Sequence, residues 1–195
     1  MAKRRTLSSD KFLRAYMIGV ALGDGNLSNP NGRAVRLRIS CDKKYPKLLA
    51  HIKKSLRLLL PENNVHVIER GICADVAVYS NQLTKLIGYQ WDAGPKDDQN
   101  VCVPLWIMDN VCYGRECLRG LLQTDGCIYT DRGYRMVSFV NTGHRLAMDV
   151  SIIMENLGHA PNIQKIFQEN GKIRYTVRIS KNTESFIKDI GLWKK

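Results

Sequence analysis

Two short segments of this chain carry the same acidic ending. The segments are residues 17–25, MIGVALGDG, and residues 118–126, LRGLLQTDG. Gly19 corresponds to Gly120 and Asp24 to Asp125, and the members of each pair lie 101 positions apart. A repeat at about half the length of a 195-residue chain predicts a pseudo-twofold molecule with one carboxylate from each half. Such an arrangement suits a shared metal site.

Close packing of two helices would bring these carboxylates together. Helices that cross closely need small residues where they touch, and Gly19 and Gly120 occupy matching places in the two apolar runs. The helix ends then meet, and so do Asp24 and Asp125, whose charges repel unless a cation lies between them. Hard oxygen ligands favour Mg²⁺ or Mn²⁺.

Backbone groups at the same place could complete the metal site. The carbonyls of Gly23 and Thr124 lie beyond the last helical hydrogen bonds and are free to add ligands. A metal ion there can activate water and stabilise the leaving oxygen of a phosphodiester. The alternative is that the two glycines only pack helices and that Asp24 and Asp125 only cap turns.

Periodic apolar residues predict the elements that position these groups. Residues 6–10 offer an N-cap for a helix over residues 12–22, and residues 26–32 are rich in turn formers. Residues 33–41 alternate, with Val35, Leu37 and Ile39 on one face of a strand. Further helices are predicted at residues 45–60, 81–87, 112–123, 145–157 and 183–190. Further strands are predicted at residues 65–70, 73–79, 127–130, 134–140, 163–168 and 173–180, with tight turns at Gly71 and at Asn170-Gly171.

Charge and composition restrict the partners. With 30 Lys and Arg against 18 Asp and Glu, the net charge is +12, which favours a polyanionic partner. No apolar run reaches the roughly 18 residues of a membrane span, and the basic residues 1–6 precede no apolar signal region. The six cysteines include no C-x-x-C pair that would indicate structural zinc. We therefore expect a protein of the cytoplasm or an organellar matrix that is not secreted and has no membrane partner.

The two motif copies resemble those of the LAGLIDADG homing endonucleases in their single-chain form. The connector at residues 103–107, followed by residues 117–121, is also similar to the family's passage between halves. The resemblance covers nearly the whole chain and implies an α/β (α+β) fold. Two pseudo-symmetric αββαββα halves, residues 1–110 and 111–195, would carry antiparallel sheets that form a DNA-binding saddle.

The resemblance also implies a reaction and its residues. It implies a monomeric, intron-encoded enzyme that makes a metal-dependent double-strand break at a long, pseudo-palindromic DNA site, with one aspartate per strand. Lys96 matches the place where the family has a catalytic lysine. The printed sequence stops soon after the last helix, so the second half offers only Lys194 or Lys181. Asp42 and Asn141 are nearest to the polar residue that the family carries at the end of the second strand.

Basic strand faces are the second functional signal. A curved antiparallel sheet can lie in the major groove and read base edges, while Lys and Arg contact phosphates. The outward candidates in the first half are Asn26, Ser28, Arg33, Arg36, Arg38, Ser40, His66, Arg70, Asp75 and Tyr79. Those in the second half are Tyr129, Arg132, Tyr134, Met136, Ser138, Gln164, Gln168, Arg174, Thr176 and Arg178.

Three alternatives stay open. Each strand face could be an ordinary solvated surface. The protein could also bind nucleic acid without cutting, as an RNA splicing maturase or a WhiA-type regulator on the same fold, although the intact Asp24 and Asp125 argue against pure binding. A fragment of an intein is disfavoured because no Cys- or Ser-led splicing block with a terminal His-Asn occurs.

Overall fold

Two halves with the same order of elements make up the structure, a computed structural model that describes residues 9–96, 98–169 and 171–194. The first half contains α1 (Lys11–Gly23), β1 (Gly25–Ser28), β2 (Arg36–Asp42), α2 (Pro46–Leu59), β3 (Val65–Arg70), β4 (Cys73–Tyr79) and α3 (Leu83–Ile87). A connector with the short helix α4 (Leu105–Met108) follows. The second half contains α5 (Val111–Thr124), β5 (Gly126–Asp131), β6 (Tyr134–Asn141), α6 (His144–Asn156), β7 (Asn162–Phe167), β8 (Ile173–Ile179) and α7 (Thr183–Ile190).

Each half forms one four-stranded antiparallel sheet. The strand orders are β1-β2-β4-β3 in the first sheet and β5-β6-β8-β7 in the second. They are the same order when the strands of each half are numbered from its first strand. The predicted α+β fold with two αββαββα halves is therefore confirmed. The division at residue 110 stays a prediction. The basic residues 1–6 and Asn170 of the predicted turn lie outside the described residues.

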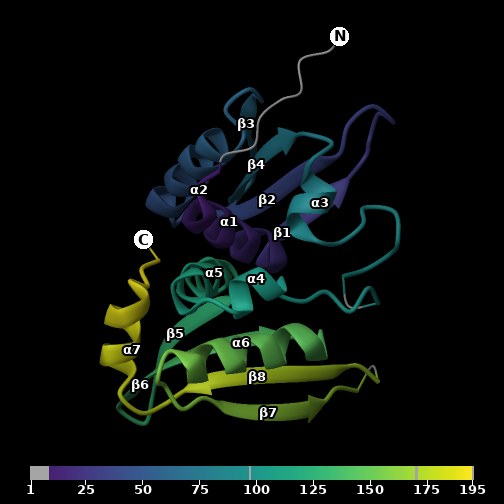
Figure 1. The fold of residues 1–195 in the computed structure, drawn as a ribbon. Helices are drawn as coiled ribbons and strands as arrows, with labels where there is room; N and C mark the ends of the chain where they lie inside the picture. The colour runs from purple at the N-terminus through teal and green to yellow at the C-terminus, as the bar shows by residue number, and fades with distance from the viewer. Residues whose placement is uncertain (1–8, 97, 170, 195) are drawn as a thin grey trace.

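Helices α1 and α5 lie side by side in the middle of the molecule, between the two sheets (Figure 1). The Asp10 side chain caps α1 by accepting hydrogen bonds from the Phe12 and Leu13 amides, at 2.9 and 3.1 Å. Asn110 caps α5 in the same way through the Cys112 and Tyr113 amides. Because α1 packs against both its own sheet and α5, its residues from Ala15 to Leu22 are all buried.

One face of each sheet covers the core. Val35, Leu37 and Ile39 are buried beneath the helices, so the alternation predicted for residues 33–41 is confirmed. Val177 and Ile179 of β8 are buried in the same way. The turn prediction for residues 26–32 is wrong at its start, because Gly25–Ser28 forms the edge strand β1 paired with β2. A strand with Leu27 as its one buried large side chain is too short to show an alternating pattern. Within the described residues, no helix has both the length and the apolar character needed to cross a membrane.

Candidate functional site

The two motif glycines lie at the closest approach of α1 and α5. A Cβ on Gly19 would stand 2.0 Å from the Cys117 carbonyl oxygen, and one on Gly120 would stand 2.4 Å from that of Tyr16. Cys117 and Tyr16 are themselves 101 positions apart, so the two contacts are reciprocal. Only glycine allows the backbones to approach this closely, and the predicted helix contact therefore has a direct steric reason.

The close approach continues to the helix ends and brings the two motif aspartates together. A Cβ on Gly23 would stand 2.1 Å from the Thr124 hydroxyl, a close contact that the sequence alone did not indicate. Just beyond, the side chains of Asp24 and Asp125 lie close enough for each to shift the pKa of the other. Two carboxyl groups this close avoid mutual repulsion when one of them carries a proton or a cation lies between them.

Burial dominates the electrostatics of this carboxyl pair. Burial, with the neighbouring Asp24 charge added to it, raises the pKa of Asp125 to about 7. Burial also raises the pKa of Asp24, although the neighbouring Asp125 carboxyl group and the charges of Lys194 and Lys96 act in the opposite direction. The two lysines therefore compensate the pair only in part, and the site favours either a proton or a further cation.

One lysine from each half lies at the end of that half's motif helix. The Lys96 ammonium donates to the carbonyl oxygens of Leu22 and Gly23, at 3.0 and 2.5 Å, and more weakly to that of Ala21. The Lys194 ammonium donates to the carbonyl oxygens of Thr124 and Gly126, at 3.0 and 3.1 Å. Cations are stabilised there because the last carbonyls of a helix carry partial negative charge.

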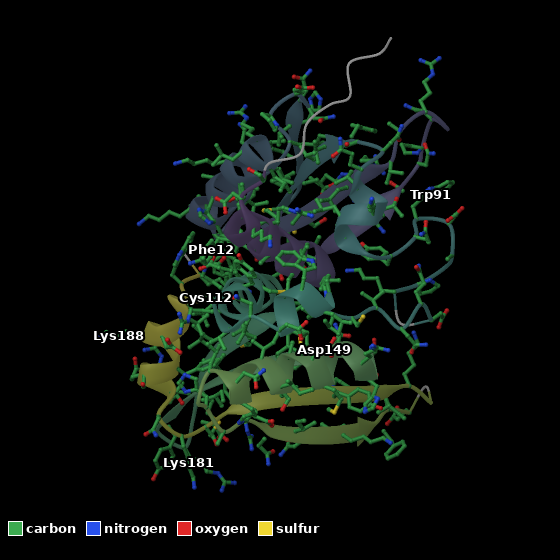
Figure 2. All side chains as sticks on the ribbon, viewed as in Figure 1. Phe12, Trp91, Cys112, Asp149, Lys181 and Lys188 are labelled. Atoms are coloured by element: carbon green, nitrogen blue, oxygen red, sulfur yellow. The ribbon has the colours of Figure 1, made fainter. Side chains whose placement is uncertain are left out.

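These lysine contacts correct the prediction of free carbonyls at the helix ends. They also show which of two lysines in the second half lies at the end of α5. The carbonyls of Gly23 and Thr124 are not free, because a lysine ammonium already uses one lone pair of each. Lys194, rather than Lys181, lies at the end of α5. Figure 2 shows Lys181 at the lower edge of the molecule, well away from the central helix pair. The sequence could not decide because the path of the chain after α7 is a tertiary property.

Two flanking cavities of similar size lie at the ends of the motif helices, one beside Gly23 and the other beside Asp24 and Thr124. One, of about 230 Å³, is lined by Gly23, Lys96 and Asn141 among others. The other, of about 220 Å³, is lined by Asp24, Asp42 and Lys194 among others. In each cavity the lysine of one half therefore meets the end of the second strand of the other half. Both are large enough for several water molecules.

Strand register places the outward candidates of the first half on one face of its sheet. Arg38 of β2 opposes Asn26 of β1 and Ala77 of β4, which in turn opposes His66 of β3. This face is opposite to the buried Leu37 and Ile39. The strand candidates that share it are Asn26, Ser28, Arg36, Arg38, Ser40, His66, Arg70, Asp75 and Tyr79. Arg33 lies in the bend before β2.

The second sheet repeats this arrangement. Its strand candidates that share one face are Tyr129, Tyr134, Met136, Ser138, Gln164, Arg174, Thr176 and Arg178. Arg132 lies in the β5–β6 turn with a positive φ of 50°, and Gln168 follows β7. Asn162 shares the face through its pairing with Arg178, and sequence reasoning missed it because it precedes the apolar pattern of β7.

Asp75 differs from the other outward candidates. Its side chain is only 3% exposed and forms an ion pair with the Arg70 guanidinium, with Nε 2.9 Å from Oδ2. The Ser40 hydroxyl donates to Oδ1 at 2.6 Å, and Arg38 lies 4.0 Å away. Asp75 is therefore surrounded by its neighbours rather than open to a base edge. Alternation placed it on the correct face but could not show these partners.

Comparisons with known proteins agree with this architecture. The family model of LAGLIDADG-like domains matches residues 113–191. No curated protein matches the sequence. The solved structure of I-DmoI in complex with DNA and Mn has a TM-score of 0.69 and 19% identity, covering 92% of this chain and 96% of that chain. The complex of I-DmoI with DNA and Ca has a TM-score of 0.60 and 16% identity, with coverage of 91% and 87%.

A second kind of protein shares the fold. The N-terminal LAGLIDADG domain of DUF199/WhiA has a TM-score of 0.62 and 11% identity, covering 97% of this chain and 88% of that chain. Residues 113–191 are thus similar to LAGLIDADG-like domains, and the chain shares the two-sheet fold of the homing endonuclease I-DmoI. At these identities the structural likeness concerns the fold.

Proposed function

We propose that this protein is a metal-dependent DNA endonuclease that hydrolyses both strands of a long double-stranded target near the axis relating its two halves. The observation that carries the proposal is the buried pair of carboxyl groups of Asp24 and Asp125, contributed by equivalent helix ends. Two buried acids held together against their mutual repulsion are costly for folding, and a metal-binding role explains why both halves keep one. I-DmoI, which shares the fold, was solved with DNA and Mn.

The donor set fits Mg²⁺ or Mn²⁺. Among residues 9–96, 98–169 and 171–194, no group of three or more His, Cys, Asp or Glu gathers, so thiolate or imidazole metal centres do not fit. Two carboxylates with carbonyl oxygens, water and phosphate are a typical Mg²⁺ environment. Asp24 and Asp125 would hold the ion, and water and phosphate oxygens would complete its coordination. The bound ion would activate water and neutralise the leaving oxygen.

The residues around the pair have separate tasks in this proposal. Lys96 and Lys194 place a positive charge beside the carboxyl pair, one in each flanking cavity, where they would stabilise the negative charge that develops on a phosphate. Asp42 and Asn141 line the opposite walls of those cavities and would orient water by hydrogen bonding. Each cavity would then serve one DNA strand.

Binding of the duplex would use the two outward sheet faces. Their Arg, Gln, Asn, Ser and Thr side chains suit base edges in the major groove, and the net charge of +12 favours phosphate contacts. The side chains on the two faces differ, so the target should be pseudo-palindromic. Both motif copies are in one chain, so we propose that it acts as a monomer.

A second candidate function is nucleic-acid binding without cleavage, in gene regulation or RNA splicing. The likeness to the DUF199/WhiA domain favours it. Only the endonuclease function requires Asp24 and Asp125 to bind a metal ion. A protein that only binds nucleic acid gains nothing from two buried carboxyl groups that repel each other when both are charged.

Cleavage of a randomised double-stranded DNA library separates the two candidates. With Mg²⁺ or Mn²⁺, sequencing of the cut ends should return one long motif, and EDTA or either aspartate-to-asparagine change should abolish the cuts. Binding of the selected site with Ca²⁺ provides the control for folding. A wild-type protein that selects a site by binding but never cuts it would overturn the endonuclease proposal and leave the binding function.

A further inference from the structure

A buried polar side chain links the motif helices to the segment that carries Lys194. Gln123 of α5 is completely buried. Its Oε1 accepts a hydrogen bond from the Tyr16 hydroxyl at 2.7 Å, and its Nε2 donates to the Trp193 carbonyl at 3.1 Å. Both ends of the carboxamide are therefore used, one toward α1 and one toward the residue before Lys194.

The corresponding position in the first half is apolar. Leu22 lies 101 positions before Gln123 and is buried in the core beside the same helix pair. A carboxamide in such a place costs free energy unless its hydrogen bonds are satisfied. Packing alone does not require a polar residue at position 123. The hydrogen bond from Gln123 to the Trp193 carbonyl suggests that this residue holds the segment before Lys194.

The segment around Trp193 is also held by packing, because Leu192 is buried in the core and Trp193 packs against that core. The Leu192 amide donates to the Ile187 carbonyl at 2.9 Å, which continues the end of α7. The Trp193 ring makes an edge contact with the His51 ring, with centroids 5.5 Å apart. The next residue, Lys194, then reaches the carbonyls of Thr124 and Gly126, with its ammonium 5.2 Å from the Tyr45 ring centroid.

We propose that Gln123 is a positioning residue for Lys194. By fixing the Trp193 carbonyl, it sets where the Lys194 ammonium lies in one of the two flanking cavities, and it thereby controls the cleavage of one DNA strand. Lys96 is held independently, in a loop where the Gln99 carboxamide donates to the carbonyls of Gln90 and Gly94. The catalytic part of this inference rests on the proposed function, whereas the anchoring part does not.

Nuclear magnetic resonance tests the anchoring without DNA. The chain has three tryptophans, and Trp193→Phe identifies the indole N–H resonance of Trp193. We expect Gln123→Met, which keeps the length of the side chain and removes both hydrogen bonds, to shift or broaden that resonance and leave the other two in place. Asn63→Leu is the matched control, because it removes a buried carboxamide that donates to the Tyr79 carbonyl in the first half. An unmoved Trp193 resonance in Gln123→Met overturns the proposal.

Strand-resolved cleavage tests the consequence for catalysis. On a plasmid with the selected target and differently labelled strands, Gln123→Met should slow the strand that Lys194→Met slows, by about tenfold or more, since small misplacements of a catalytic group have effects of this size. The other strand should change by less than about twofold, so nicked circles accumulate. Tyr16→Phe should have a weaker effect on the same strand.

The outcomes separate the two proposals. Equal slowing of both strands by Gln123→Met means a general loss of stability and overturns the positioning role. A wild-type protein that cuts no DNA overturns the proposed function and, with it, the catalytic part of this inference. The indole resonance still decides in that case whether Gln123 anchors the segment.

Discussion

The two halves present the same acid at the same helix end but build the surroundings of that acid differently. Lys96 reaches the end of α1 from the long loop after α3, whereas Lys194 reaches the end of α5 from a short segment after α7. At the second-strand ends, Asp42 forms an ion pair with Lys44 at 2.8 Å, while Asn141 accepts a hydrogen bond from the Gly143 amide at 2.8 Å. The two acids thus form one common centre, whereas the lysine and the strand-end residue beside that centre are built differently in each half.

This difference implies which functions are shared and which are separable. Changes to the acid pair should affect both strands, whereas changes to one flank should affect one strand.

Loss of either acid should abolish both cuts. Because Asp24 and Asp125 would hold the metal jointly, we expect Asp24→Asn and Asp125→Asn each to reduce cleavage of both strands by roughly a thousandfold or more. Single-turnover kinetics on the strand-labelled target measures this. Loss of only one strand in each variant would show that the acids serve separate centres.

Loss of one lysine should affect one strand. Lys96→Met and Lys194→Met should each slow a different strand by roughly a hundredfold, as expected when a charged catalytic group is removed. The same kinetic assay measures both variants, and the exposed Lys188→Met on α7 is the control. If both variants slowed the same strand, the assignment of one cavity to each strand would be wrong.

The reciprocal glycine contacts should be equally sensitive in the two halves. Gly19→Ala and Gly120→Ala place a methyl group against a backbone carbonyl of the other helix, so each should lower the free energy of unfolding by about 3 kcal/mol or more. Urea denaturation measures the change. Gly133→Ala, at a positive φ of 82° but with open space around it, should cost less, about 1 kcal/mol.

The carboxyl pair should make stability depend on pH. The pKa of Asp125 is about 7 in the folded protein against an ordinary value of 3.8, so the folded state binds this proton more tightly than the unfolded chain. Ionisation therefore lowers the free energy of unfolding as the pH rises from about 4 to about 7. Asp125→Asn should remove that slope and raise stability at pH 8 by about 1 to 3 kcal/mol.

Thermal denaturation across this pH range measures the effect, and the exposed Asp131→Asn is the control. Mg²⁺ at pH 8 should raise the melting temperature of the wild type because it binds the ionised pair, and it should raise that of Asp125→Asn less. A wild type whose stability did not fall between pH 4 and pH 7 would contradict the electrostatic picture.

The smallest expected effect concerns the sheet faces. Asp75→Asn loosens the hold on Arg70, and we expect up to a tenfold change in DNA affinity in Ca²⁺, confined to base substitutions in one half-site. Ser138→Ala, on the matching face of the second sheet, is the comparison. Competition binding with half-site variants measures both. A uniform change across the whole target would show that Asp75 acts on the fold rather than on its neighbours.

Local chemistry determined how well the sequence predicted the fold. The hairpin of β3 and β4 was predicted with correct ends, because Gly71, which has a positive φ of 53°, separates two short runs that each contain two valines. Strand β1 was missed, since its pairing with β2 rather than its own pattern makes it a strand. Local signals suffice where a turn residue separates two runs of strand-forming residues. They fail where a segment becomes a strand only through pairing with its neighbour.

The candidate site likewise contains contacts that the sequence pattern predicted and contacts that it did not. The repeat predicted the meeting of Asp24 and Asp125 because equal spacing in two similar helices implies a symmetric contact. The place of Lys194 and the ion pair of Asp75 depend on how distant segments come together, and the sequence pattern does not contain that information. The DNA contacts, the localisation and the metal stay predictions.

The glycine contacts between α1 and α5 set both the packing of the core and the distance between Asp24 and Asp125. A substitution that changed the spacing of these helices by a fraction of an ångström would move Asp24 relative to Asp125 by a similar amount. Stabilising changes on the outer strands β3 and β7, which mainly contact β4 and β8, should leave that distance unchanged. Directed evolution for heat resistance should therefore accumulate substitutions at the periphery of the molecule and leave its central helix pair unchanged.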